Sequence, residues 1–188
     1  MKEVVILSAV RTPIGKMGRQ LAKYSSVQLG TLAAKAAIQQ AKIQPEIIDQ
    51  TIIGNVLQAG SGQNVARQIS LNSGLPVTST AMTINQVCGS GIKAIRLAQS
   101  AIVMGDADVV LAGGTESMSN VPYLLPDMRQ GTKYGEKKVL DGIEHDALRD
   151  AFTQDLMGIT AENVATKYHV SRAEQDAFSL RSHQRAQA

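Results

Sequence analysis

The sequence has one cysteine among its 188 residues, no tryptophan, two phenylalanines and only 3% aromatic residues. A single cysteine cannot form an internal disulfide, which favours a reducing compartment, so we expect a cytoplasmic protein. The apolar run at residues 4–10 is too short to span a membrane, and it lacks the basic region and cleavage pattern of a signal peptide. Aromatic residues do not interleave with basic ones, so we expect no nucleic-acid partner and no membrane partner.

The charge balance is also modest, with a formal net charge of +3 at pH 7. A slightly basic solvated surface explains it, and weak attraction for a polyanionic, nucleotide-bearing ligand is the sharper alternative. The same two readings apply to the lysines of residues 133–138. Cys88 has no histidine or carboxylate at ligand spacing, so no metal site is predicted.

Apolar segments alternate between strand-like and helix-like patterns along the first two thirds of the chain. We predict strands at residues 4–10, 52–57, 81–85 and 108–114, of which the first and the last are expected to be buried. We predict helices at residues 25–42, 65–72 and 89–104, the last of them apolar or small almost all round and therefore internal. Strands that alternate with helices predict an α/β fold with a largely parallel or mixed sheet.

The composition changes after Ser117. Residues 119–155 are polar, charged and rich in Met, Pro and Gly, which predicts a long functional or interface-forming excursion with a little helix of its own. A helix is expected to open at Thr160, and Ser171 with Glu174 forms a capping box for a final helix. That last helix has no stop signal before the chain ends.

The cysteine lies in Asn85-Gln86-Val87-Cys88-Gly89-Ser90-Gly91, between a predicted strand and a predicted helix. A helix N-terminus favours a thiolate, and its free N–H groups can stabilise an oxyanion. The two glycines allow a substrate carbonyl to approach the backbone closely. A small buried hydrophobic cysteine is the competing interpretation, and the residues alone leave both open.

Several motifs in order along the chain resemble those of thiolases. The match begins at residues 11–15 and 60–68, centres on residues 85–94 around Cys88, and continues through residues 113–119, 157–165 and 171–176. Within that family, residues 146–152 and the pair Ala161-Glu162 are most similar to acetyl-CoA acetyltransferases of the short-chain biosynthetic type.

The resemblance implies a thiolase-like layered α/β fold, comprising the N-terminal αβα half with a mixed sheet and part of the loop domain. Residues 1–118 would form the core domain, and residues 119–188 the partial loop domain with the start of the returning helices. Cys88 would take the acetyl group of acetyl-CoA, a second acetyl-CoA would attack it, and acetoacetyl-CoA and CoA would form reversibly. Met157 would line the acyl pocket, and no cofactor is implied beyond the CoA thioesters. The resemblance also implies that the full-length protein forms a homo-oligomer, either a dimer or a tetramer.

The sequence also departs from the family. Thiolases are roughly twice as long, and the other half carries a Gly-His-Pro histidine, a Cys-x-Gly cysteine that acts as the base, and a water-positioning Asn. The histidines at 145, 169 and 183 match none of these positions. Two alternatives therefore stay open: a truncated or split-gene fragment without independent activity, and a related ketoacyl-synthase-type condensing enzyme. The isolated chain is also expected to expose apolar surface and to associate.

Overall fold

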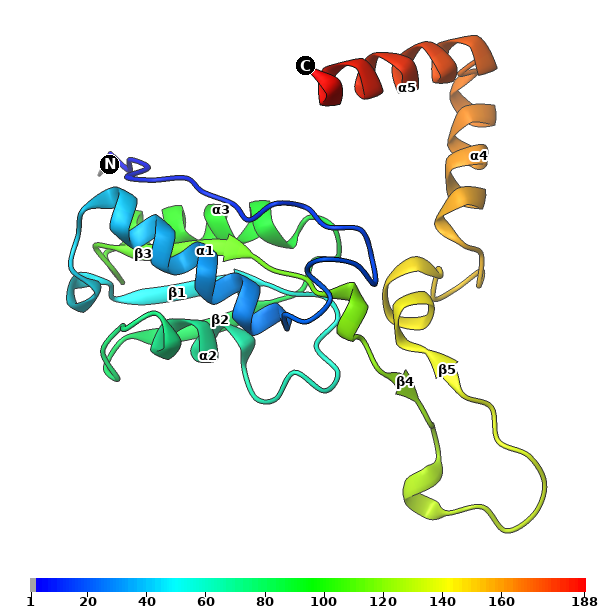
Figure 1. Ribbon diagram of the computed structural model, residues 1–188, viewed down its shortest axis with the longest axis horizontal. Helices are drawn as coiled ribbons and strands as arrows, with labels where there is room; N and C mark the ends of the chain where they lie inside the picture. The colour runs from blue at the N-terminus through cyan, green and yellow to red at the C-terminus, as the bar shows by residue number, and fades with distance from the viewer. Residues whose placement is uncertain (1–2) are drawn as a thin grey trace. The chain divides into compact units, whose positions relative to one another are not determined.

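The computed structural model describes residues 3–188 (Figure 1), which form two compact units divided between Ala147 and Leu148. The main elements of the first unit are α1 (Ser26–Ala41), β1 (Gln50–Gly54), α2 (Val65–Asn72), β2 (Thr80–Ile84), α3 (Ser90–Met104) and β3 (Val110–Gly114), followed by the short strands β4 (Tyr123–Leu124) and β5 (Leu140–Asp141). The second unit contains α4 (Met157–Tyr168) and α5 (Arg172–Gln187).

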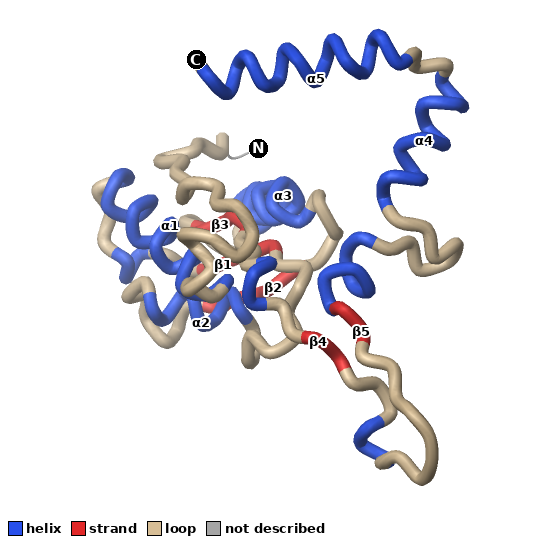
Figure 2. Tube along the Cα trace, turned by 45° about the vertical axis from the view of Figure 1, so that its right-hand side comes forward, coloured by secondary structure: helices blue, strands red, loops and turns tan. Residues whose placement is uncertain are grey.

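The core of the first unit is a parallel sheet of three strands in the order β2-β1-β3. Figures 1 and 2 show α1 and α2 on one face of this sheet and α3 on the other. Ile52 and Ile53, successive residues of the central strand, point to opposite faces because side chains alternate along a strand. Ile53 packs with α1 and α2, whereas Ile52 packs against Ala94 and Ala98 of α3. The expected αβα layering is present, and the three strands of this sheet are parallel.

The start of the sheet is tied together by Asp49, which precedes β1. Its Oδ2 accepts hydrogen bonds from the backbone N–H groups of Val109 (3.0 Å) and Asp108 (2.8 Å). These two hydrogen bonds, that of Val109 first, lower the pKa of the Asp49 carboxyl because they stabilise its charged form. The carboxylate therefore links the starts of β1 and β3.

Local signals explain the helix boundaries. The Oγ of Ser25 accepts the N–H of Gln28, the Gln28 side chain accepts the N–H of Ser25, and this capping box starts α1. Lys42 ends the helix in the left-handed region. The predictions of α1 and α2 are confirmed, and the three strands of the sheet lie within a few residues of their predicted positions.

Two predictions of burial are wrong. Residues 4–10 form no strand, and Val5, Ile6 and Leu7 are 66%, 76% and 56% exposed, because no neighbouring strand edge among residues 3–188 pairs with this run. Helix α3 is internal only along the face that carries Ala94, Ala98 and Ala101. Its opposite face exposes large apolar side chains at Ile92, Ile95 and Met104.

The excursion after β3 contains an antiparallel pair, β4 with β5, and short helical turns. In the second unit, α4 begins at Met157 and not at Thr160 as predicted, and its N-cap residue Leu156 makes no side-chain capping bond. The capping box of Ser171 and Glu174 starts α5 as predicted. Over residues 3–188 no helix has both the length and the apolar character that crossing a membrane requires.

Candidate active site

Cys88 lies in the five-residue connection 85–89 between β2 and α3, which we call the elbow, and its side chain is exposed. Gly89 is the N-cap of α3 and has no side chain to cap the helix. No side chain therefore caps the first turn of α3, in which the Ser90 N–H donates to the Val87 carbonyl at 3.1 Å. This agrees with the predicted position of the cysteine before a helix, and the alternative of a buried hydrophobic cysteine is wrong.

The side chains of Asn85, in the elbow, and of Ser90, the first residue of α3, hold the elbow backbone in a sharp bend. The Asn85 Oδ1 accepts the N–H of Val87 at 2.9 Å. The Ser90 Oγ accepts the N–H of Gln86 at 2.9 Å and donates to the Val87 carbonyl at 2.6 Å. Val87 has φ 49°, a left-handed conformation that is rare for a β-branched residue. Such backbone persists where the surroundings over-determine it, and here it precedes Cys88 directly.

The first turn of α3, directly after the elbow, rests on the carboxyl ends of β1 and β3. A Cβ added to Gly54 would lie 2.6 Å from the Ser90 Cβ and 2.9 Å from the Gly91 nitrogen. A Cβ added to Gly114 would lie 3.4 Å from the Gly91 Cα. Because Gly54 and Gly114 have no side chains, the first turn of α3 can approach the backbone of the sheet closely. The carboxyl ends of parallel strands are where open α/β sheets bind ligands.

The Glu116 carboxylate, which bonds to the loop after β1, is a feature whose role the sequence analysis missed. Glu116 accepts hydrogen bonds from the Asn55 side chain (2.8 Å) and from the backbone N–H groups of Val56 (3.1 Å) and Leu57 (3.0 Å). Asn55 is fully buried. In the sequence, Glu116 stands out only as a charged residue shortly after the small residues that end β3, within the motif at residues 113–119, and neither signal reveals its partners.

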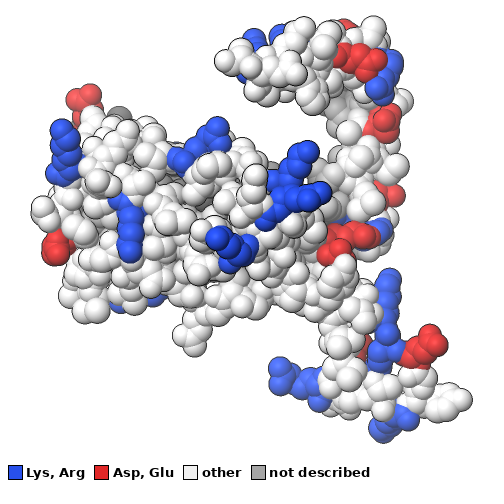
Figure 3. All heavy atoms as spheres, in the orientation of Figure 1, with Lys and Arg blue, Asp and Glu red and all other residues white. Residues whose placement is uncertain are grey.

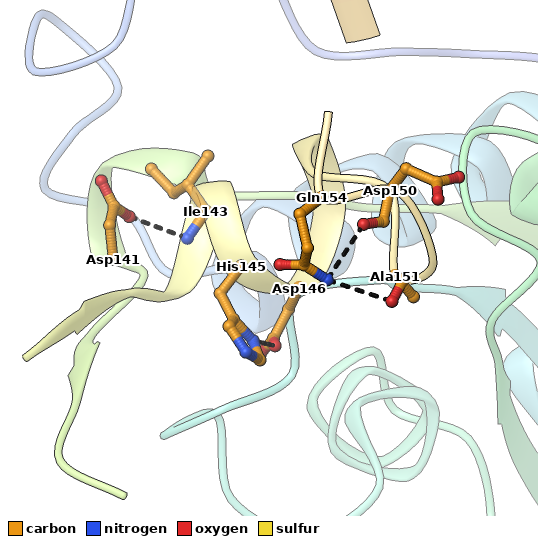
Figure 4. Close-up of polar contacts among 7 residues, drawn as sticks. All are labelled: Asp141, Ile143, His145, Asp146, Asp150, Ala151 and Gln154. Carbon is orange, nitrogen blue, oxygen red and sulfur yellow. Dashed lines mark hydrogen bonds and ion pairs between the residues drawn. The ribbon is translucent and has the colours of Figure 1, made fainter. Parts of the chain in front are cut away.

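The other expected site residue, Met157, lies in the second unit. It is the first residue of α4 and is 51% exposed. Exposed histidines occupy other elements: His145 lies beside Asp146 with 2.6 Å between Nδ1 and Oδ1, His169 is the C-cap of α4, and His183 is on α5. Figure 4 shows His145 turned toward Asp146.

The turn at residues 150–154 overlaps the segment at residues 146–152 that resembles acetyl-CoA acetyltransferases, and its hydrogen bonds are local. Asp150 Oδ1 accepts the N–H groups of Thr153 and Phe152, both at 2.8 Å, and these bonds lower the pKa of the Asp150 carboxyl. The Gln154 side chain donates to the carbonyls of Asp150 and Ala151, as Figure 4 shows. These contacts stabilise a turn.

The basic side chains do not gather into one patch on the face that Figure 3 draws. Figure 3 shows Lys and Arg in separate groups on the face drawn, with uncharged residues between them. Within residues 3–188, no three His, Cys, Asp or Glu side chains come together in a way that could hold a metal ion. The chemistry that this part of the molecule offers is that of an accessible thiol beside uncapped helix N–H groups.

Comparison with known proteins places these features in a family. Residues 4–188 match the family model described as "Thiolase, N-terminal domain". An acetyl-CoA acetyltransferase of Chromobacterium violaceum is 52% identical over 186 residues, which cover 99% of this chain and 47% of the relative. One of Cupriavidus necator is 50% identical over 188 residues, covering 100% of this chain and 48% of the relative.

A solved structure agrees with the sequence match. The crystal structure of the Acat5 thiolase from Ascaris suum in complex with coenzyme A is 41% identical, with a TM-score of 0.95. The alignment covers 99% of this chain and 48% of that one, and the predicted fold class is confirmed. The chain spans about half the length of the curated relatives it matches.

Proposed function

Because this chain belongs to the thiolase family, we propose that its whole protein is an acetyl-CoA C-acetyltransferase in which Cys88 carries the acetyl group. The observation that carries the proposal is the exposed Cys88 in the elbow before α3, in a chain about half identical to proteins named acetyl-CoA acetyltransferase. The substrates are acetyl-CoA and acetoacetyl-CoA, and no cofactor takes part beyond these CoA thioesters.

The first half-reaction is acyl transfer to sulfur. The Cys88 sulfur attacks the thioester carbonyl carbon of acetyl-CoA, the carbonyl oxygen gains the negative charge, and the CoA sulfur leaves as the carbonyl re-forms. CoA takes up the proton that the Cys88 thiol gave up. The backbone N–H of Cys88 would form part of the oxyanion hole that stabilises this charge.

The second half-reaction forms a carbon–carbon bond. A base removes a proton from the methyl group of a second acetyl-CoA, and the resulting carbanion attacks the carbonyl of acetyl-Cys88. The bond from that carbonyl to sulfur breaks, which releases acetoacetyl-CoA, and the proton held by the base returns to the Cys88 sulfur. The family resemblance assigns the base and the activating histidine to Cys-x-Gly and Gly-His-Pro motifs, which residues 1–188 lack. We propose that a further stretch of polypeptide supplies them.

The remaining assignments follow from the family. Residues 1–118 are proposed as the core domain and residues 119–188 as part of the loop domain, with Met157 lining the acyl pocket. The whole protein would act in the cytoplasm as a homo-oligomer, a dimer or a homotetramer. A polypeptide that spans about half of its relatives is also a candidate for a fragment that acts only with a complementary chain.

The test is the intact mass of this chain after incubation with acetyl-CoA, with Cys88→Ser as the matched control. One acetyl group on the native chain and none on the control supports Cys88 as the acyl carrier. No acetylation of the chain alone, followed by acetylation when a polypeptide bearing the two missing motifs is added, supports the complementary-chain proposal. No acetylation in either case refutes the proposed role of Cys88.

A further inference from the structure

The Glu116 carboxylate engages both of its oxygens in the structure. Oε1 accepts from the Asn55 side-chain nitrogen (2.8 Å) and from the Leu57 N–H (3.0 Å), while Oε2 accepts from the Val56 N–H (3.1 Å). Hydrogen bonds to a charged acceptor are about twice as strong as those between neutral groups. The carboxylate therefore fixes the loop that follows β1.

That loop contacts the elbow at its entry and at its exit. The Asn55 N–H donates to the carbonyl of Ile84 at 3.0 Å, and Ile84 is the last residue of β2 before the elbow. Gly54, directly before Asn55, lies against Ser90 and Gly91, where α3 leaves the elbow. A shift of Gly54 and Asn55 would therefore be transmitted to both ends of the segment that carries Cys88.

Glu116 also determines which way the Asn55 amide points. The Nδ2 of Asn55 donates to the Thr115 carbonyl (2.9 Å) and to Glu116, whereas its Oδ1 has no donor among the described residues. Turning the amide over would place Oδ1 against two acceptors. The buried amide is thus held in one orientation, and the Thr115 N–H bonds back to the Gly54 carbonyl at 3.0 Å.

We propose that Glu116 is a positioning residue for Cys88, acting through Asn55 to hold the elbow against the sheet so that the sulfur faces the first turn of α3. Glu116 makes no contact with substrate in this role. The proposal rests on the proposed function only in naming Cys88 as the reacting group, and its consequence is that Cys88 reactivity depends on Glu116.

The test uses the single cysteine, whose alkylation by iodoacetamide reports on Cys88 alone. Rates are compared at neutral pH for the folded chain and for the chain in urea. We expect the folded chain to react faster, and Glu116→Gln to lower the folded rate about threefold, the size of effect that a helix N-terminus exerts on a nearby anion. The glutamine presents an NH₂ group to a backbone N–H that needs an acceptor.

Ser117→Ala is the matched control. Its hydroxyl donates to the Tyr24 carbonyl at 2.7 Å, so its loss weakens the fold beside Glu116 without touching Asn55. We expect this variant to lower the unfolding temperature and to leave the folded alkylation rate unchanged. A folded Glu116→Gln chain that reacts at the wild-type rate overturns the proposal, as does a wild-type chain that reacts no faster folded than unfolded.

Two further measurements separate the outcomes. Where circular dichroism shows Glu116→Gln unfolded, Asn55→Ala takes its place, because the Val56 and Leu57 bonds to Glu116 remain, and the folded rate must fall in the same direction. With acetyl-CoA, the limiting acetylation rate should fall while the half-saturating concentration stays constant. If the chain is acetylated neither alone nor with the added polypeptide, but Glu116→Gln lowers its alkylation rate, the proposed function is refuted and the positioning role is supported.

Discussion

Gly54→Ala is the substitution that tests most directly how the elbow sits on the sheet. The new Cβ would lie 2.6 Å from the Ser90 Cβ, 2.7 Å from the Ser90 carbonyl carbon and 2.9 Å from the Gly91 nitrogen. Two of these atoms belong to the backbone of the first turn of α3, which cannot move aside by changing a rotamer. The sheet and α3 must separate locally to accommodate one methyl group.

The magnitude follows from overpacking in a filled core, which costs about 1–3 kcal/mol, and backbone neighbours put this site near 3 kcal/mol. Gly113→Ala is the matched control, because Gly113 lies in β3 beside Ile53 of β1 and a Cβ there meets nothing within 4 Å. That control should be stabilised by up to about 1 kcal/mol through the lower entropy of the unfolded chain.

The assay is urea unfolding of both variants, followed by far-ultraviolet circular dichroism at a protein concentration low enough to limit association. We expect Gly54→Ala to be less stable than Gly113→Ala by roughly 3–4 kcal/mol. The corresponding difference in unfolding temperature is about 6–16 °C for a chain of this size. Stabilities that agree within about 0.5 kcal/mol would refute the close approach of α3 to β1.

Three further outcomes are expected. The pKa of Asp49 is lowered by its bond to the Val109 N–H, so its stabilisation is present above about pH 4 and is lost as the pH falls through the lowered folded value. Urea midpoints of wild-type and Asp49→Asn chains should therefore converge in acid, and a gap independent of pH would contradict this. Ser171→Ala removes the acceptor for the Glu174 N–H and should destabilise α5 by about 1 kcal/mol, seen as faster amide exchange over residues 172–187. Ile95→Glu places a charge on the exposed apolar face of α3 and should reduce self-association in sedimentation velocity, whereas a monodisperse wild-type monomer would count against such association.

Local chemistry explains which elements the sequence could predict. A capping box lies within four residues of sequence, so a local pattern reveals it. Helices α1 and α5 begin directly after the first residue of such a box, Ser25 with Gln28 and Ser171 with Glu174. Helix α4 begins at Met157, and its N-cap residue Leu156 has no side-chain oxygen that could cap it. The sequence analysis therefore placed the helix start at Thr160, which has a hydroxyl. A helix start without a capping side chain gives no signal to find.

The candidate site likewise has one feature that the sequence predicts and others that it does not. The position of Cys88 between a strand and a helix was predictable, because the strand before it and the helix after it each have their own periodicity. The bond from Asn55 to Glu116 joins residues 61 positions apart, and no local pattern records it. The left-handed Val87 was equally hidden, because valine is among the residues least expected there.

The two wrong predictions of burial have one cause. Residues 4–10 and the outer face of α3 both have the composition of segments covered on all sides. The sheet, however, covers only one side of α3, and the run at residues 4–10 is exposed. Hydrophobic pattern records burial but not the identity of the covering surface. Both segments are more exposed than their sequences predict. An error in reading the periodicity would not make both segments more exposed, so we infer that their apolar side chains pack against a surface outside residues 3–188. If Ile95→Glu abolishes association, at least part of that cover is apolar contact on α3; if association persists, the run at residues 4–10 is the surface to change next.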